Sequence, residues 1–371
     1  MARPGLPPDL IDDAMAEILL RVPPDEPADL VRASLADKRC RRILTDPNFL
    51  RRYREFHRPP PLLGFFHNHP PDDVGSMPRF VATTGASPLP PPEFDGEEWW
   101  AMSGRHGRVL IDVGDTGQGL VVWEPLTGDR RRVYLPVLCA ARGCSHLNCH
   151  GGPFIVVGVG SGVGIIHVFV YSLDTGAWTQ ATSVDSGGVD YMGAQKGILI
   201  GDEIYFTLGW GDAILKYEVG RNRLSMFDPP KVYDRASLVQ MEDGSLGLAG
   251  SEGSTIYLWS WNGTHGGAAR WVQSRVIDFE KLLPSSKLCE TAEVIGFAEG
   301  LGVMFVGTFV GVYTIEVKSG KMKRIGDPGV FYPIVPFMSF CTPGKAPPSS
   351  LLIIYNPNIY SFLGDTCMVL C

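Results

Sequence analysis

The densest group of side chains that could do chemistry is a run of cysteines and histidines within residues 139–152. It comprises Cys139, Cys144, His146, Cys149 and His150. Thiolate and imidazole are good zinc ligands, and the spacing Cys144-x-His146-x-x-Cys149 would let three side chains reach one ion. The spacing matches none of the common zinc-finger patterns, and buried cysteines often serve as small apolar residues. We therefore expect an ordinary loop with no metal, with zinc binding and thiol redox chemistry as the lesser alternatives.

A second candidate is the glycine-rich stretch GVGSGVG at residues 158–164. A dinucleotide site would need a helix directly after such glycines. The residues that follow, IIHVFVYSL at 165–173, have the β-branched and aromatic content of a strand, so the glycines predict a hairpin turn. The sequence also contains no HExxH, phosphate-loop or nucleophile-elbow pattern. We expect no catalytic residue and no cofactor, and hence a protein that is not an enzyme.

A basic run raises the question of nucleic acid. Its members are Lys38, Arg39, Arg41, Arg42, Arg51, Arg52 and Arg54. The whole chain carries a net charge of −7, whereas general nucleic-acid binders are normally basic. We expect solvent-facing arginines that pair partly with Asp37, Asp46 and Glu55 and help to steer an acidic partner, and no nucleic-acid partner.

These residues lie on two regions with different periodicity. Residues 1–58 read as helices at about 10–21, 28–35 and 35–44, followed by one that begins after Asp46-Pro47. Short helices in so small a module bury little surface, so we expect a partner or a packed neighbour. Arg58 and the prolines after it end the helical pattern.

From Leu62 onward, short apolar runs alternate with turn residues, which predicts strands. Apolar strands that carry an aromatic residue recur at intervals of roughly 42 to 54 residues, the range of β-propeller blades. The marker residues are Trp123, Tyr171, Tyr217, Trp259 and Tyr313. Residues 61–343 leave room for six blades, whereas the tail 344–371 fits no repeat. Trp99, Trp100 and Trp210 could anchor a partner or form blade core.

Residues 6–44 resemble the F-box, through LPPDLIDDAMAEILLRVPP at 6–24 and ADLVRASLADKRCRRIL at 28–44. The unit WEPLTGDRRRVYLP at 123–136 is similar to the propeller-type associated domains of large plant F-box families. One departure from the F-box pattern is Cys40, because the family often has tryptophan near this position. A smaller residue there predicts looser packing of the third helix.

The resemblance implies that the helical module binds a Skp-type adaptor and, through it, a cullin. It places that contact on Leu6, Pro7, Leu10, Ile18, Leu19, Leu30 and Leu35. Short helices with apolar residues on more than one face are suited to docking against a partner. The alternative is that these residues form the module's own core, and we expect some of them to do so.

The sequence thus predicts a small all-α F-box module (1–58), a six-bladed β-propeller (61–343) and a C-terminal tail (344–371). The implied function is a substrate-recognition subunit of a Skp–cullin–F-box (SCF) ubiquitin ligase in the cytoplasm or nucleus, with an unidentified protein target. Alternatives are a carbohydrate-binding or enzymatic propeller with an unrelated helical leader, and a degenerate F-box protein that no longer binds adaptor. No run of about 18 apolar residues occurs, so we expect no membrane span.

Overall fold

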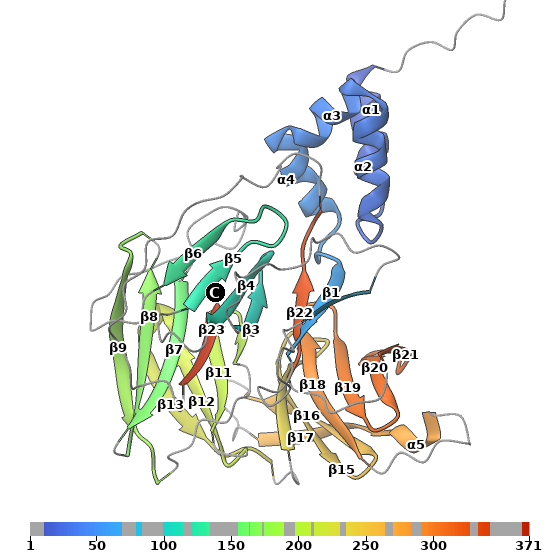
Figure 1. Ribbon diagram of the computed structural model, residues 1–371. Coiled ribbons are helices and arrows are strands. Elements are labelled where there is room, and N and C mark those ends of the chain that lie inside the picture. The colour runs from blue at the N-terminus through green and yellow to red at the C-terminus, as the bar shows by residue number, and fades with distance from the viewer. Residues whose placement is uncertain are drawn as a thin grey trace, which may run out of the picture.

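The computed structural model describes fourteen stretches of the 371-residue chain. They are residues 11–68, 79–83, 99–113, 120–133, 155–162, 164–172, 174–188, 197–208, 211–230, 235–263, 270–282, 291–326, 333–341 and 366–370. Figure 1 shows a helical module that stands on one end of a ring of small sheets.

The module contains four short helices: α1 (Asp12–Leu20), α2 (Pro27–Ala36), α3 (Lys38–Thr45) and α4 (Pro47–Phe56). Proline begins α2 and α4, where its missing N–H costs nothing. The Asp37 carboxylate accepts from the backbone N–H of Arg39 at 2.7 Å, which caps α3. Asp46 accepts from two backbone N–H groups at the start of α4, as its position before Pro47 predicts.

The helices enclose one apolar core. It consists of Leu19, Leu20, Leu30, Cys40, Ile43, Leu44, Phe49, Tyr53 and Phe340. Cys40 is buried in this core. The Tyr53 hydroxyl donates to the carbonyl oxygen of Val22 at 2.8 Å. Phe340 belongs to the propeller part of the chain, so the module and the propeller share this core.

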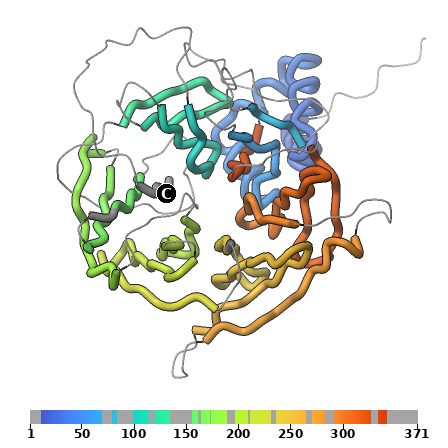
Figure 2. Tube along the Cα trace, turned by 60° about the horizontal axis from the view of Figure 1, so that its bottom comes forward, coloured from blue at the N-terminus to red at the C-terminus, as the bar shows by residue number. Residues whose placement is uncertain are grey.

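The propeller has six antiparallel sheets, and Figure 2 shows them arranged around one axis. Listed from the axis outward, the first two sheets are β22 (Val335–Met338), β1 (Leu62–His67) and β2 (Arg79–Ala82), and then β3 (Trp99–Arg105), β4 (Arg108–Val113), β5 (Leu120–Trp123) and β6 (Arg130–Val133). The next two are β23 (Thr366–Leu370), β7 (Ile155–Gly162), β8 (Ile165–Ser172) and β9 (Ala177–Asp185), and then β10 (Ile198–Ile200), β11 (Glu203–Leu208), β12 (Ala213–Glu218) and β13 (Arg223–Phe227). The last two are β14 (Arg235–Gln240), β15 (Leu246–Glu252), β16 (Thr255–Asn262) and β17 (Arg270–Asp278), and then β18 (Ala292–Ala298), β19 (Val303–Thr308), β20 (Gly311–Glu316) and β21 (Met322–Gly326). A short α5 (Phe279–Leu282) follows β17, and a 3-10 turn η1 (Val219–Arg221) joins β12 to β13.

The repeated aromatic residues occupy equivalent places in the ring. Each of the five four-stranded sheets carries one of them on its third strand from the axis. They are Trp123 on β5, Tyr171 on β8, Tyr217 on β12, Trp259 on β16 and Tyr313 on β20. The predicted repeat and the predicted six-bladed fold are therefore confirmed. Among the described residues the sixth sheet has three strands, β22, β1 and β2, and its third strand carries the aromatic residue Phe80.

The ends of the propeller chain close two of the sheets. β22 pairs with β1 near the other end of the chain, with Phe65 opposite Pro336. β23 lies within the tail 344–371, where the sequence predicted no repeat, and pairs with β7, with Met368 opposite Gly158. The sequence pattern missed this strand because it is separated along the chain from the three other strands of its sheet.

The buried side-chain amide of one asparagine connects backbone segments close to where β22 pairs with β1. Asn68 follows β1 and is 1% exposed. Its Nδ2 donates to the carbonyl oxygen of Ala101 on β3 at 2.8 Å and to that of Pro333 at 3.3 Å, and its Oδ1 accepts from the N–H of Ala101 at 2.9 Å. Asn68 therefore links the end of β1 to β3 and to the segment just before β22.

We expect Asn68→Ala to lower the free energy of unfolding by about 3 kcal/mol, because it leaves buried backbone groups without partners. Urea unfolding followed by tryptophan fluorescence measures this loss. Asn48→Ala is the matched control, since Asn48 is exposed on α4. Equal stability of the two variants would show that the buried amide does not join the strands energetically.

Candidate functional site

The helical module presents exposed apolar side chains on α1, on the residue just before it and on α2. The exposed fractions are 70% for Ile11, 52% for Ile18, 37% for Val31 and 81% for Leu35. Residues seven apart, or four apart, lie on the same face of a helix, so Ile11 and Ile18 share one face and Val31 and Leu35 another. We call these four side chains the apolar module surface. Burying a fully exposed side chain of this kind contributes about 1.5–3 kcal/mol, so each of the four would contribute a part of that in proportion to its exposed fraction.

The predicted adaptor-binding residues divide into three groups. Ile18 and Leu35 belong to the apolar module surface. Leu19 and Leu30 lie in the module core, as expected for some of the seven residues, and there they hold the helices together. Leu6, Pro7 and Leu10 lie outside the described residues. Ile11 and Val31 were missed, although their spacing from Ile18 and Leu35 was visible in the sequence.

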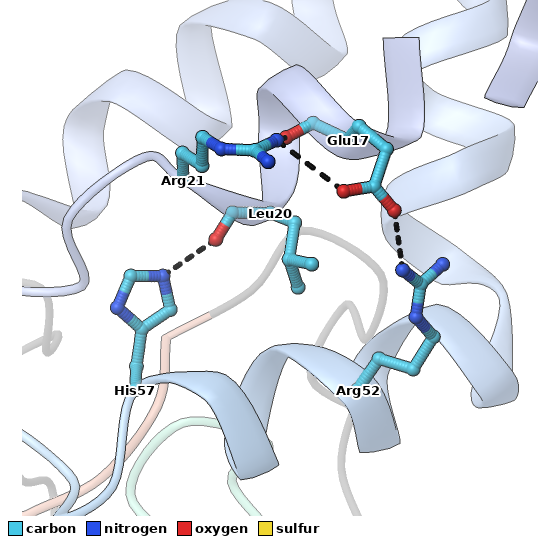
Figure 3. A network of polar contacts seen from close by, with 5 residues as sticks. All are labelled: Glu17, Leu20, Arg21, Arg52 and His57. Atoms are coloured by element: carbon cyan, nitrogen blue, oxygen red, sulfur yellow. Dashed lines mark hydrogen bonds and ion pairs between the residues drawn. The ribbon is translucent and has the colours of Figure 1, made fainter. Parts of the chain in front are cut away.

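The arginines of the module pair mainly with α1. Figure 3 shows the Glu17 carboxylate between Arg21, at 3.3 Å, and Arg52 of α4. In the same view, His57 Nε2 lies 2.7 Å from the carbonyl oxygen of Leu20. The hydrogen bond from Arg52 lowers the pKa of Glu17 below its ordinary value. These contacts tie the end of α4 to the end of α1.

Asp12 makes the second set of charged contacts. Arg39 reaches it at 3.0 Å, and Arg42 also pairs with it. The hydrogen bond from Arg39 lowers the pKa of Asp12. The expectation of partly paired arginines is thus confirmed, but the expected carboxylates were wrong. Asp37 and Asp46 instead cap helices.

A cavity of about 670 Å³ lies where the module meets the propeller axis, and we call it the junction cavity. Its walls come from the inner strands β3, β10, β14, β18 and β22, from the end of α4 and from the prolines after it. Many lining side chains are apolar: Ile198, Leu199, Leu238, Val294, Ile295, Phe297, Val335, Met338 and Phe340. A side-chain carbon added to Gly300, just after β18, would lie 3.7 Å from Pro59 Cβ. The cavity therefore reaches the linker between the two domains.

Charged groups gather at this end of the junction cavity. Arg105 of β3 forms an ion pair with Glu299, and their side chains are 12% and 27% exposed. Arg54 projects from α4, and its buried Nε has no hydrogen-bond partner among the residues that the structure describes. Burial lowers the pKa of Arg54. Arg58 also lines the cavity and is exposed.

Other sequence hypotheses have separate outcomes. The predicted hairpin is confirmed, because β7 and β8 pair with Gly162 opposite Ile165, but Gly158, Gly160 and Gly162 lie within β7 and not in the turn. Trp99 is 4% exposed and belongs to a core cluster, so it is blade core and not an anchor. The cysteine-histidine run at 139–152 and Trp210 lie outside the described residues. In the parts of the chain that the structure describes, no helix has the length and apolar character needed to cross a membrane.

No family model matches the sequence, and no curated protein matches it. Among solved structures, a protein of unknown function from Bacteroides thetaiotaomicron is 14% identical, with a TM-score of 0.41 and 68% of each chain covered. A functionally unknown protein from Desulfotomaculum acetoxidans is 13% identical, with a TM-score of 0.40, and the match covers 71% of this chain and 96% of that one. An extracellular domain from B. thetaiotaomicron is 12% identical, with a TM-score of 0.34, and only 28% of its chain is covered.

These similarities are too weak to support any argument about activity. The class of protein follows from the architecture itself: the chain is a six-bladed β-propeller preceded by a four-helix module.

Proposed function

We propose that this protein is a substrate-recognition subunit of an SCF-type ubiquitin ligase. In this proposal the helical module binds a Skp-type adaptor and, through it, a cullin, while the propeller holds a protein target. The observation that supports it is the apolar module surface, which belongs to a segment that resembles the F-box. Large apolar side chains that stay exposed on a folded helical module are suited to a partner surface.

The charge of the module supports the same proposal. Arg41 and Arg51 are exposed, whereas Arg42 and Arg52 are paired with carboxylates of α1. Exposed cations beside an apolar contact speed the approach of an acidic partner and contribute little to the final affinity. An acidic adaptor would therefore meet an attractive field around the apolar module surface.

The mechanism in this proposal is proximity. The ligase would bring a charged ubiquitin carrier close to lysines of the bound target, which raises their effective concentration. The chain itself would supply binding and orientation and no reacting group. It would act where such ligases work, in the cytoplasm or the nucleus.

Co-purification tests the proposal directly. The full chain, mixed with a purified Skp-type adaptor, is expected to elute from size-exclusion chromatography as a 1:1 complex with a dissociation constant below about 1 μM, corresponding to about −8 kcal/mol. Separate elution at micromolar concentrations would refute adaptor binding. That outcome would favour the alternative of a degenerate F-box protein.

The junction cavity favours a second candidate, a ligand-binding or enzymatic propeller with an unrelated helical leader. Its volume lies within the range of small-molecule sites. Such a propeller would bind its ligand without needing an adaptor. The co-purification experiment therefore separates the two candidates.

A further inference from the structure

We propose that the junction cavity binds an apolar organic acid, that is, a single carboxylate carried on an apolar body. Two sources have this chemistry: a free organic acid, and the carboxyl-terminal residues of a protein. The proposal rests on the cavity alone and does not depend on adaptor binding.

The shape of the cavity favours a small ligand or a chain end. Its volume of about 670 Å³ is typical of sites that enclose most of a ligand's surface. Inner strands of five sheets surround it, so its walls are held by the hydrogen-bonded propeller and not by loops alone. A site on such a frame is already formed before a ligand enters.

The apolar walls favour a hydrocarbon body. Phe297, Val335 and Met338 lie on inner strands, and Phe340 extends the apolar wall toward the module. Transfer of hydrocarbon from water onto such walls gains roughly 25 cal/mol per Å² of buried apolar surface. A highly hydroxylated ligand would gain little from them.

The charges at the module end favour an anionic group. Glu299 is already paired with Arg105, whereas the Nε of Arg54 is buried and without a partner among the described residues. Arg54 is half-buried and lines the cavity. A partly buried guanidinium without a carboxylate partner is costly, and a carboxylate in the cavity would relieve that cost through hydrogen bonds to its terminal N–H groups. Arg58 adds a second cation at the same end.

The remaining ionisable groups of the cavity limit the charge of the ligand. Glu293 lies near the start of β18, whereas Glu299 follows the other end of that strand. The Glu293 carboxylate therefore repels an anion mainly at the end of the cavity away from the module. His106, in the turn after β3, adds a cation only when protonated. Beyond the Arg105–Glu299 pair, Arg54, Arg58 and Glu293 sum to a charge of +1, which suits a monoanion better than a phosphate, whose charge is about −1.5 to −2.

A ligand in this place would bridge the two domains. Arg54 and Arg58 belong to α4 and the segment after it, whereas the apolar walls belong to the propeller. Binding only to the docked arrangement would stabilise it by mass action. Occupancy of the cavity would therefore raise the melting temperature of the full chain.

The test uses displacement of a fluorescent apolar anion, anilinonaphthalene sulfonate, from the full chain. Octanoate is expected to displace the dye at a concentration about tenfold lower than 1-octanol, because a charged hydrogen bond is worth about 1.5–3 kcal/mol. Short peptides that end in leucine or phenylalanine form the second arm, each compared with its carboxyl-terminal amide. Displacement by octanoate alone indicates a free acid, and displacement by the unamidated peptides alone indicates a protein chain end.

Variants locate the effect. Arg54→Gln is expected to remove the advantage of octanoate over octanol, and Arg54→Lys to keep part of it. Arg51→Gln, on the exposed face of α4, is expected to change nothing. Equal displacement by octanoate and octanol, absence of displacement by any acid, or full retention of the advantage in Arg54→Gln would overturn the proposal. If Arg54→Gln fails to fold, the parent comparison and Arg54→Lys decide.

Discussion

Replacing both Ile18 and Leu35 by aspartate is expected to abolish capture of a Skp-type adaptor and to leave the chain folded. In the proposed complex each aspartate would place a carboxylate in an apolar contact, which costs several kcal/mol. A combined cost of about 4 kcal/mol corresponds to roughly a thousandfold weaker dissociation constant. Both side chains are exposed in the free protein, at 52% and 81%, so the free energy of unfolding should change by less than about 0.5 kcal/mol per site.

Isothermal titration calorimetry with purified adaptor measures the loss, and thermal unfolding checks the fold. A matched control carries the same kind of change on the propeller, Val272→Asp with Val276→Asp on β17, where the two valines are 39% and 49% exposed. This control should bind adaptor like the parent. Unchanged affinity in the Ile18 and Leu35 variant would reject the apolar module surface as the contact. Leu19→Asp is uninformative, because Leu19 is a core residue.

The sequence predicted the outer part of each blade better than the part next to the axis. The third strands carry an aromatic residue on a long apolar run, which is a strong local signal of a strand. Two of the inner strands, β3 and β18, instead contain glycines at close approaches, which weaken that signal. A side-chain carbon on Gly104 would lie 2.7 Å from the Pro336 carbonyl oxygen, and one on Gly296 would lie 2.7 Å from Ile334.

The candidate sites were predictable to different degrees. Helical spacing identified apolar residues of α1 and α2, but in such short helices it did not separate the buried Leu30 from the exposed Leu35. The junction cavity was not predictable, because it needs side chains from segments far apart in the sequence. Arg54 looked like its neighbours Arg51 and Arg52, and only the docking of α4 on the propeller distinguishes it.

The C-terminal strand β23 provides the second large expected effect. It supplies the inner strand of the sheet that also contains β7, β8 and β9, and it contacts β3 of the neighbouring sheet. Its removal would expose one backbone edge of β7, from Val156 to Gly160, beside the propeller axis. Unpaired strand edges recruit other chains, so aggregation should accompany the loss of stability.

Deleting residues 366–371 is therefore expected to lower the free energy of unfolding by more than about 4 kcal/mol, which exceeds the loss caused by most single substitutions. Thermal unfolding with simultaneous light scattering measures both consequences. Deletion of Cys371 alone is the control, because it keeps every residue of β23. Val156, Val157 and Val159 on β7 are fully buried. Without β23, water would reach these side chains from the axis, and the other five blades have no strand that could cover them. A deletion variant that melts like the control and remains monomeric would show that the ring closes without its last strand.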